Sequence, residues 1–193
     1  MGRVEVVDPR SAERPGLQHF IAAQYARIYG ARITHFAEHL VGLRHPAGGW
    51  AAGLGYTLPG AEPLFIEQYL ERSIEDTIAS MLGVPVYRGQ VVEVGNLAAT
   101  STGAARELIV YMTRMLHGLG RSWVVFTSTR ALLNSFARLG IATISLARAD
   151  PARLSDGGES WGTYYATDPH VMTASIPLGF AHLRFRQAID AVR

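Results

Sequence analysis

The stretch VVEVGNLAATSTGAAREL, residues 91–108, decides the fold that we expect for this chain. It opens as a valine-rich strand with one carboxylate and passes through small residues into an amphipathic helix. The first N–H groups of such a helix are unpaired and lie at the positive end of its dipole. Gly103, Ala104 and Ala105 leave room for an anion at those amides, and Arg106 adds positive charge. The stretch therefore predicts a phosphate-binding helix start; the simpler alternative is that small residues only permit close helix–strand packing.

The rest of the chain alternates strands and helices around this stretch. Helices are expected where apolar residues recur at helical spacing, and strands where apolar runs alternate or lie between Gly and Pro. The expected helices are 17–30, 73–83, 103–120, 129–140 and one beginning near Ala181; the expected strands are a hairpin over 36–58 and then 90–99, 122–128 and 141–147. This order predicts an α/β (α+β) protein, and a chain of 193 residues is expected to form one domain, 1–193.

Composition excludes several kinds of chemistry. The sequence has no Cys and no Lys, which excludes disulfides, thiolate zinc sites, a Cys nucleophile and a lysine Schiff base. A net charge of +2 is too small to indicate nucleic-acid binding, although a basic chain suits an acidic partner such as a carrier protein. No apolar run is long enough to span a bilayer, and the N-terminus has no apolar core of a signal peptide. A cytoplasmic protein without a membrane role is expected, and its oligomeric state is not indicated.

The segment TSTGAA, 100–105, resembles a known phosphate-binding loop. In the GNAT acyltransferase superfamily, an R/Q-x-x-G-x-G/A loop holds the pyrophosphate of coenzyme A. Gly103 and Ala105 match this pattern, whereas Thr100 stands where Arg or Gln is usual.

Two further resemblances concern the strand and the wider chain. VEVGNLA, 92–98, resembles the E-x-S-R strand of acyl-homoserine lactone synthases: Glu93 matches the acid, and Asn96 stands in place of the arginine. Four segments are similar to signatures of the thermostable haemolysin family, a group with a GNAT-like fold. They are EPLFIEQYLERSIE (62–75), VVEVGNLA (91–98), WVVFTSTRALLNSFARLG (123–140) and WGTYY (161–165).

These resemblances imply a fold and a reaction. The fold is a GNAT-like mixed, mostly antiparallel sheet flanked by helices, with a splay of the strands near residues 95–99. The pantetheine arm of a donor is then expected at the backbone of Leu97, Ala98 and Ala99. The donor is acyl-coenzyme A or a phosphopantetheinyl acyl carrier protein, with no tightly bound cofactor, and the acceptor is a small-molecule amine. Glu93 is expected to accept a proton from the attacking amine, with Asn96 beside it in the catalytic site; the alternative for Glu93 is a carboxylate paired with an Arg across the sheet.

The sequence departs from the GNAT pattern at the group that protonates the leaving thiolate. The position where that superfamily has a Tyr holds Phe136. We therefore expect either no protein acid or assistance from Tyr164, Tyr165 or Asn134, the last placed with the donor-binding residues. Trp161, Tyr164 and Tyr165 are expected to form a wall of the acceptor pocket, the alternative being ordinary packing under a loop. Strand alternation places Glu93 and Asn96 on opposite faces, unless a bulge at Gly95 changes this.

Other readings of the sequence remain. HFAEH, 35–39, matches a zinc motif, but in an extended strand its two His lie about 13 Å apart, so no metal site is expected. GESWG, 158–162, matches a nucleophile motif without the strand and helix that it requires. The alternative function is that of a non-catalytic or membrane-active protein on a degenerate acyltransferase fold. Phe136 and Thr100 support it, because both depart from the GNAT pattern.

Overall fold

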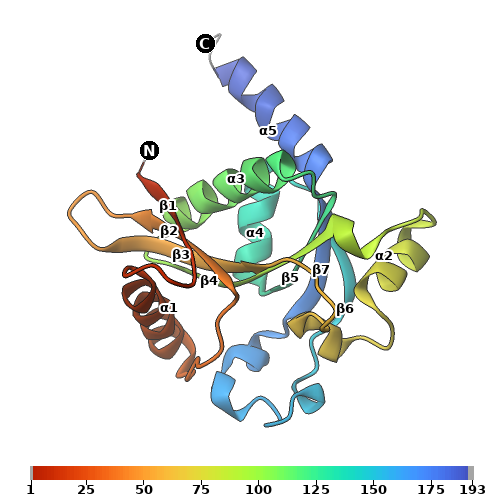
Figure 1. The fold of residues 1–193 in the computed structure, drawn as a ribbon, viewed down its shortest axis with the longest axis horizontal. Helices are drawn as coiled ribbons and strands as arrows, with labels where there is room; N and C mark the ends of the chain where they lie inside the picture. The colour runs from red at the N-terminus through yellow and green to blue at the C-terminus, as the bar shows by residue number, and fades with distance from the viewer. Residues whose placement is uncertain (1, 191–193) are drawn as a thin grey trace.

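The computed structural model of the protein describes residues 2–190, where seven strands form one mixed sheet (Figure 1). The order across the sheet is β1-β2-β3-β4-β5-β7-β6. The strands are β1 (Val4–Val7), β2 (His39–Arg44), β3 (Trp50–Thr57), β4 (Val91–Ala99), β5 (Trp123–Ser128), β6 (Ile144–Arg148) and β7 (His170–Ser175). β4 and β5 are parallel, and the other neighbouring strands are antiparallel. The expected mixed, mostly antiparallel sheet is confirmed.

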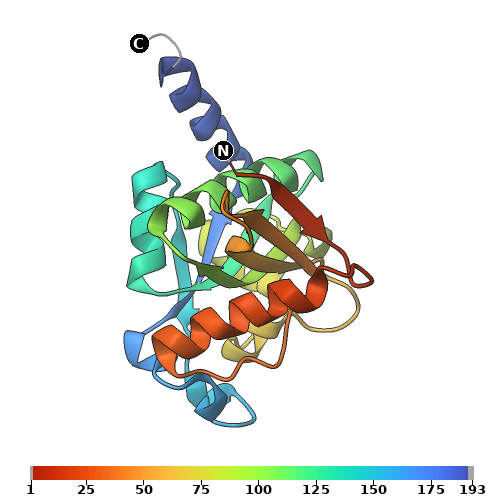
Figure 2. The ribbon, with the colours of Figure 1, turned by 90° about the vertical axis from the view of Figure 1, so that its left-hand side faces the viewer.

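Helices cover both faces of the sheet. They are α1 (Arg14–Tyr29), α2 (Ile74–Leu82), α3 (Thr102–Gly118), α4 (Arg130–Leu139) and α5 (Ile176–Asp190). Figures 1 and 2 show α1 on one face and α3 and α4 on the other, with α5 projecting from the body. Leu17 and Ile21 of α1 pack against Ala98, whereas Leu108 and Met112 of α3 pack on the opposite face. Because each helix buries one apolar side, the sheet is sandwiched between two hydrophobic layers.

Most predicted elements are confirmed, and four differences are instructive. β1 and β7 were not predicted, because β1 is a short edge strand that carries a Glu and β7 has no alternating pattern. β7 lies between β5 and β6 with both faces covered, which removes the need for polar residues on one side. The final helix begins at Ile176 instead of near Ala181. β2 begins at His39, so residues 36–38, which were predicted as strand, precede it.

The two halves of the sheet separate in its middle. β4 pairs with β5 only over Val91–Glu93, opposite Trp123–Val125. Beyond this point β4 continues beside β3, and β5 continues beside β7 as far as Ser128. The edge of β4 that faces β5 is therefore free of strand partners from Val94 onward, and the splay expected near residues 95–99 is confirmed.

A β-bulge lies at the point of separation. β4 advances from Gly95 to Ala98 while β3 moves only from Gly55 to Gly53, so β4 contains one extra residue. Asn96 has φ of 55°, the left-handed conformation that Asn tolerates better than most residues. A bulge reverses the alternation of side chains that follow it. Glu93 and Asn96 consequently lie on the same face, which is the outcome expected for a bulge at Gly95 and not the outcome of regular alternation.

Candidate active site

A cavity of about 390 Å³ crosses the sheet where β4 and β5 separate. Its walls come from both faces. On one face α1 contributes Gln24, Tyr25, Ile28 and Tyr29; on the other, α3 contributes Ala105, Ile109, Met112, Thr113 and Leu116, and α4 contributes Ala131, Leu132, Ser135 and Phe136. Residues 94–99 of β4 form one edge, and Val124, Phe126 and Thr127 of β5 form the other. The lining also includes Ile176 and Gly179, at the start of α5.

The predicted donor-binding residues fall into two groups. Leu97, Ala98, Ala99 and Ala105 line the cavity, as expected for a donor site beside the free edge of β4, whereas Thr100, Gly103, Ala104 and Arg106 do not line it. The backbone N–H and the hydroxyl of Thr100 both donate to the carbonyl of Ala51, at 2.9 and 3.1 Å. Thr100 thus secures the end of β4 to β3.

The start of α3 is partly capped by the protein itself. Ser101 is the N-cap: its Oγ accepts the N–H of Ala104 at 3.2 Å, and its carbonyl accepts the N–H of Ala105 at 3.1 Å. Among the described residues no hydrogen bond engages the N–H groups of Thr102 and Gly103. Two amides at the positive end of the helix dipole are therefore available to an anion. Ser101 and Thr102 line the cavity, and sequence reasoning missed both, although a Ser before a helix is a recognisable cap.

The α4 residue predicted for the donor site does not line the cavity. Asn134 is exposed and does not line the cavity, whereas the next residue, Ser135, is buried and does. One residue rotates the side chain by about 100° around a helix, so the two point in different directions. Phe136 also lines the cavity and stacks on Phe126 with ring centroids 4.8 Å apart. Phe136 therefore contributes an apolar wall instead of a proton donor.

Glu93 is buried beside the cavity, with 8% of its surface exposed. Its carboxylate accepts the backbone N–H groups of Phe65 at 2.8 Å and Ile66 at 3.1 Å, so backbone amides, and not an Arg across the sheet, satisfy it. Burial raises the pKa of Glu93 to about 7, while the two amides lower it. Val94 and Gly95 line the cavity but Glu93 does not, so its carboxylate lies behind the cavity wall.

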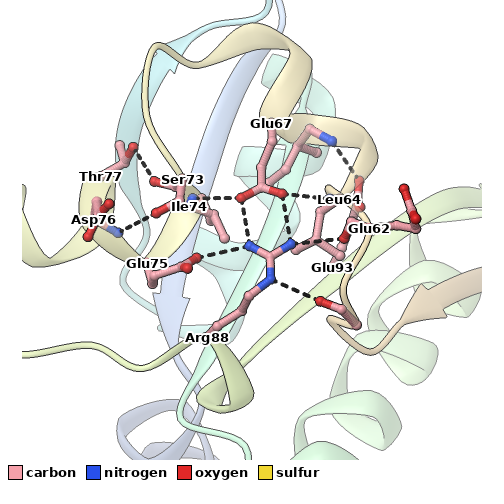
Figure 3. A network of polar contacts seen from close by, with 12 residues as sticks. Glu62, Leu64, Glu67, Ser73, Ile74, Glu75, Asp76, Thr77, Arg88 and Glu93 are labelled. Atoms are coloured by element: carbon pink, nitrogen blue, oxygen red, sulfur yellow. Dashed lines mark hydrogen bonds and ion pairs between the residues drawn. The ribbon is translucent and has the colours of Figure 1, made fainter.

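A charged network holds the turn that donates these amides (Figure 3). Phe65 and Ile66 begin the 3-10 turn η1 (Phe65–Tyr69). Within this turn the carboxylate of Glu67 accepts the N–H groups of Leu64 at 2.6 Å and Ile74 at 2.8 Å. Both terminal nitrogens of Arg88 donate to the same carboxylate, at 2.9 and 3.0 Å. Arg88 also donates to the carboxylate of Glu75 and to the carbonyls of Gly60 and Glu62. Glu67 and Arg88 therefore fix the turn that positions Glu93.

The three aromatic residues predicted for the acceptor pocket form one cluster, with ring centroids 5.3–6.1 Å apart, but they do not all line the cavity. Tyr164 lines the cavity, and its hydroxyl donates to Thr127 Oγ1 at 3.2 Å. Tyr165 does not line the cavity; its hydroxyl bonds that of Tyr69 at 2.5 Å. Trp161 borders a separate hollow of about 190 Å³. Burial raises the pKa of Tyr164, Tyr165 and Tyr69, so these phenols are neutral at physiological pH.

Two tyrosines of α1 complete the wall that Tyr164 begins. Tyr25 and Tyr29 both line the cavity, and the rings of Tyr29 and Tyr164 meet edge to face with centroids 5.2 Å apart. This role could not be predicted, because residues spaced by four on an amphipathic helix look like ordinary core.

The side chain of Asn96 holds a neighbouring segment. Its Oδ1 accepts the N–H of Ala37 at 3.1 Å, and its Nδ2 donates to the carbonyl of His35 at 3.4 Å. The two His of the zinc motif face different partners, since His35 stacks on Phe65 and His39 stacks on Tyr56. The side chain of Asn96 thus secures residues 35–37 beside the cavity.

The sequence matches the family described as thermostable hemolysin over residues 7–180. The chain belongs to the thermostable hemolysin family. No curated protein matches it.

Solved structures share the fold of this thermostable hemolysin family member at low sequence identity. The acyl-homoserine lactone synthase LasI has a TM-score of 0.60 at 11% identity, over 91% of this chain and 90% of that one. FeeM, an N-acyl amino acid synthase from uncultured soil microbes, has a TM-score of 0.60 at 14% identity, over 93% and 98%. The coenzyme A-dependent acyl-homoserine lactone synthase BjaI, solved with SAM and isopentyl-CoA, has a TM-score of 0.61 at 13% identity, over 96% and 89%. The GNAT-like fold is therefore shown.

We expect the carboxyl of Glu93 to titrate near pH 7 in the folded protein, because burial raises its pKa from 4.5 to about 7. The pKa in the folded state lies above that in the unfolded state, so ionisation opposes folding. The cost is absent below about pH 4.5, grows as the pH rises to 7, and then stays near 3 kcal/mol. Carbon-13 NMR of glutamate-labelled protein measures the midpoint, and Glu93→Gln identifies the resonance. A midpoint near 4.5 would contradict the assignment.

Replacing Arg88 by Met is expected to destabilise the protein by about 3 kcal/mol, because it leaves the buried carboxylate of Glu67 without its cation. The loosened turn should also withdraw its amides from Glu93 and raise the midpoint of that carboxyl further. Urea unfolding and the same NMR titration measure the two effects. Arg148→Met is the matched control, since Arg148 and its partner Asp168 are both mostly exposed and it should change neither quantity much. Equal effects in the two variants would contradict the role of Arg88.

Proposed function

We propose that this protein is an acyltransferase that moves an acyl group from a thioester of coenzyme A or of an acyl carrier protein to the amine of a small molecule. The observation that carries the proposal is the cavity that crosses the sheet between β4 and β5. Such a passage lets a donor and an acceptor meet from opposite faces. The solved relatives support it, because LasI and BjaI are acyl-homoserine lactone synthases and FeeM is an N-acyl amino acid synthase.

The donor site lies between β4 and the starts of α3 and α4. The unpaired edge of β4 at Leu97, Ala98 and Ala99 offers backbone groups to the amides of a pantetheine arm. The free N–H groups of Thr102 and Gly103 bind the phosphate end, and the guanidinium of Arg106, one turn into the helix, adds positive charge. Thr100 has no part in this site because Ala51 engages its hydroxyl.

The acyl chain occupies the inner part of the cavity. The lining there is apolar, with Ile109, Met112 and Leu116 from α3, Phe136 from α4 and Ile176 from α5. Transfer of a hydrocarbon chain from water into such surroundings is favourable in proportion to the area buried. The acyl group therefore extends away from the reaction point toward Gly179.

The reaction takes place at the splay. The acceptor ammonium loses one proton to Glu93 through water and becomes a free amine. Its nitrogen bonds to the acyl carbon while the C–S bond breaks and its electron pair goes to sulfur. The second nitrogen proton passes to the thiolate. A thiol has a pKa near 8.5, so the thiolate leaves readily and Phe136 need not be replaced by an acid.

A non-catalytic role on the same fold is the competing function. Phe136 and Thr100 do depart from the GNAT pattern, as that alternative requires. The cavity favours the enzyme, since a fold that had lost its chemistry would be free to fill it with larger side chains. Over residues 2–190 none of the helices combines the length and apolar character needed to cross a bilayer.

Glu93→Gln is expected to keep thioester binding and lose about 10²- to 10⁴-fold in turnover, because it removes the base alone. In the wild type the turnover should rise with pH through about 7, as Glu93 ionises, and the variant should lack that rise. Calorimetry with an acyl-coenzyme A series measures binding, and thiol release measures turnover. Glu159→Gln, at an exposed site, is the control. Absence of thioester binding, or full turnover by Glu93→Gln, would count against the proposal.

Gly179→Leu is expected to shorten the preferred acyl chain, because the new side chain fills the inner end of the cavity. A Cβ at Gly179 meets its nearest neighbours at 3.6 Å, so the site accepts a side chain. Competition between acyl-coenzyme A donors of different chain length measures the preference. Gly179→Ala serves as the small-residue control, and Gly118→Leu, which adds the same side chain outside the cavity, serves as the second. An unchanged preference in Gly179→Leu would show that the chain lies elsewhere.

A further inference from the structure

The cavity contains no charged side chain. Among the described residues that line it, none is an Asp, Glu, Lys, Arg or His. Its polar side chains are the hydroxyls of Ser, Thr and Tyr residues and the amides of Gln24 and Asn96. These groups can accept or donate hydrogen bonds, but none can neutralise an ion.

This lining discriminates between acceptors by their charge. A carboxylate that leaves water without a cationic partner costs several kcal/mol, and hydroxyl groups recover only part of that cost. The free amides at the head of α3 do not help, because the proposed donor phosphate occupies them. Glu93, two residues before the cavity-lining Gly95, is negative when ionised, so it attracts an ammonium and repels a carboxylate.

The wall of the cavity on the α1 face, opposite the proposed donor site at α3 and α4, is aromatic, and we take it as the acceptor side. Tyr25, Tyr29 and Tyr164 line it, and Ile28 adds an aliphatic surface between the two α1 tyrosines. The ring of Tyr164 lies 5.2 Å from that of Tyr29 and 6.3 Å from that of Tyr25, measured between centroids. Aromatic walls of this kind pack well against an aryl or alkyl body.

We infer that the acceptor is an aryl-alkyl or alkyl monoamine without a carboxylate, and not an α-amino acid. The inference rests on the proposed acyl transfer and specifies its second substrate. The only charge of such an acceptor is its ammonium group, which loses a proton to Glu93 before it reacts. The rest of the molecule lies against the tyrosines.

Matched pairs that differ by one carboxylate test the inference. Tyramine is compared with tyrosine, and phenethylamine with phenylalanine, using the same acyl-coenzyme A donor. We expect kcat/KM to be at least about 100-fold larger for the amine of each pair, since an unpaired carboxylate is strongly disfavoured in the cavity. An amino acid that is used as well as its amine, or better, would overturn the inference.

A designed variant tests the cause of the preference. Ile28→Arg places a guanidinium on the α1 wall at a half-exposed position that tolerates a long side chain. The variant should use tyrosine at least about 10-fold better relative to tyramine, whereas Ile28→Met should keep the preference for tyramine. If Ile28→Arg leaves the ratio unchanged, the absence of a cation is not the cause.

Calorimetry of tyramine and tyrosine on the protein without donor separates the two proposals. Tighter binding of tyramine without any turnover would retain the acceptor class and reject acyl transfer. Turnover of tyrosine in preference to tyramine would retain acyl transfer and reject the acceptor class. If the protein neither binds nor acylates either compound, the inference on the acceptor fails.

Discussion

The separation of β4 from β5 after Glu93 and Val125 is the constraint on which the site depends. Each strand keeps one partner, β3 or β7, so the sheet remains anchored on both sides of the gap. The bulge at Asn96 diverts β4 at this point and prevents it from pairing with β5 again. Backbone groups inside a protein normally have partners, so an interior edge without a strand is a place where a ligand with amide groups binds well. The geometry of the backbone, more than any single side chain, creates the proposed donor site.

The charged side chains that support the site lie behind the cavity wall and not in the cavity itself. Arg88 and Glu67 lie behind the turn η1, where their ion pair fixes the two amides that bind Glu93. Glu93 in turn lies behind the cavity wall, next to Val94 and Gly95. The buried carboxylate is thus stabilised by backbone dipoles and needs no cation beside it. This arrangement leaves the interior of the passage neutral, which suits an acyl chain and an acceptor with little charge.

Local signals in the sequence predicted much of the fold. The run from residue 91 to 108 indicated the central strand and the helix after it, whereas the splay was implied by the resemblance to GNAT-like folds. Interactions between distant residues could not be predicted from the sequence. Arg88 and Glu67, for example, are separated by 21 positions, and nothing in the intervening sequence indicates that they pair. The left-handed conformation of Asn96 was also hidden, and it reversed the faces expected for the residues that follow. Tyr25 and Tyr29 resembled ordinary core, because a helix that lines a cavity and a helix that covers a sheet show the same apolar spacing.

The passage through the sheet has a consequence for how the proposed reaction proceeds in time. Its walls come from α1 on one face and from α3 and α4 on the other, so each substrate reaches the splay from its own side. Neither substrate of the proposed reaction must be released before the other binds. The chain also has no cysteine to hold an acyl group between two half-reactions. In the proposed reaction transfer is therefore direct within a ternary complex, as in sequential kinetics, without an acyl-cysteine intermediate.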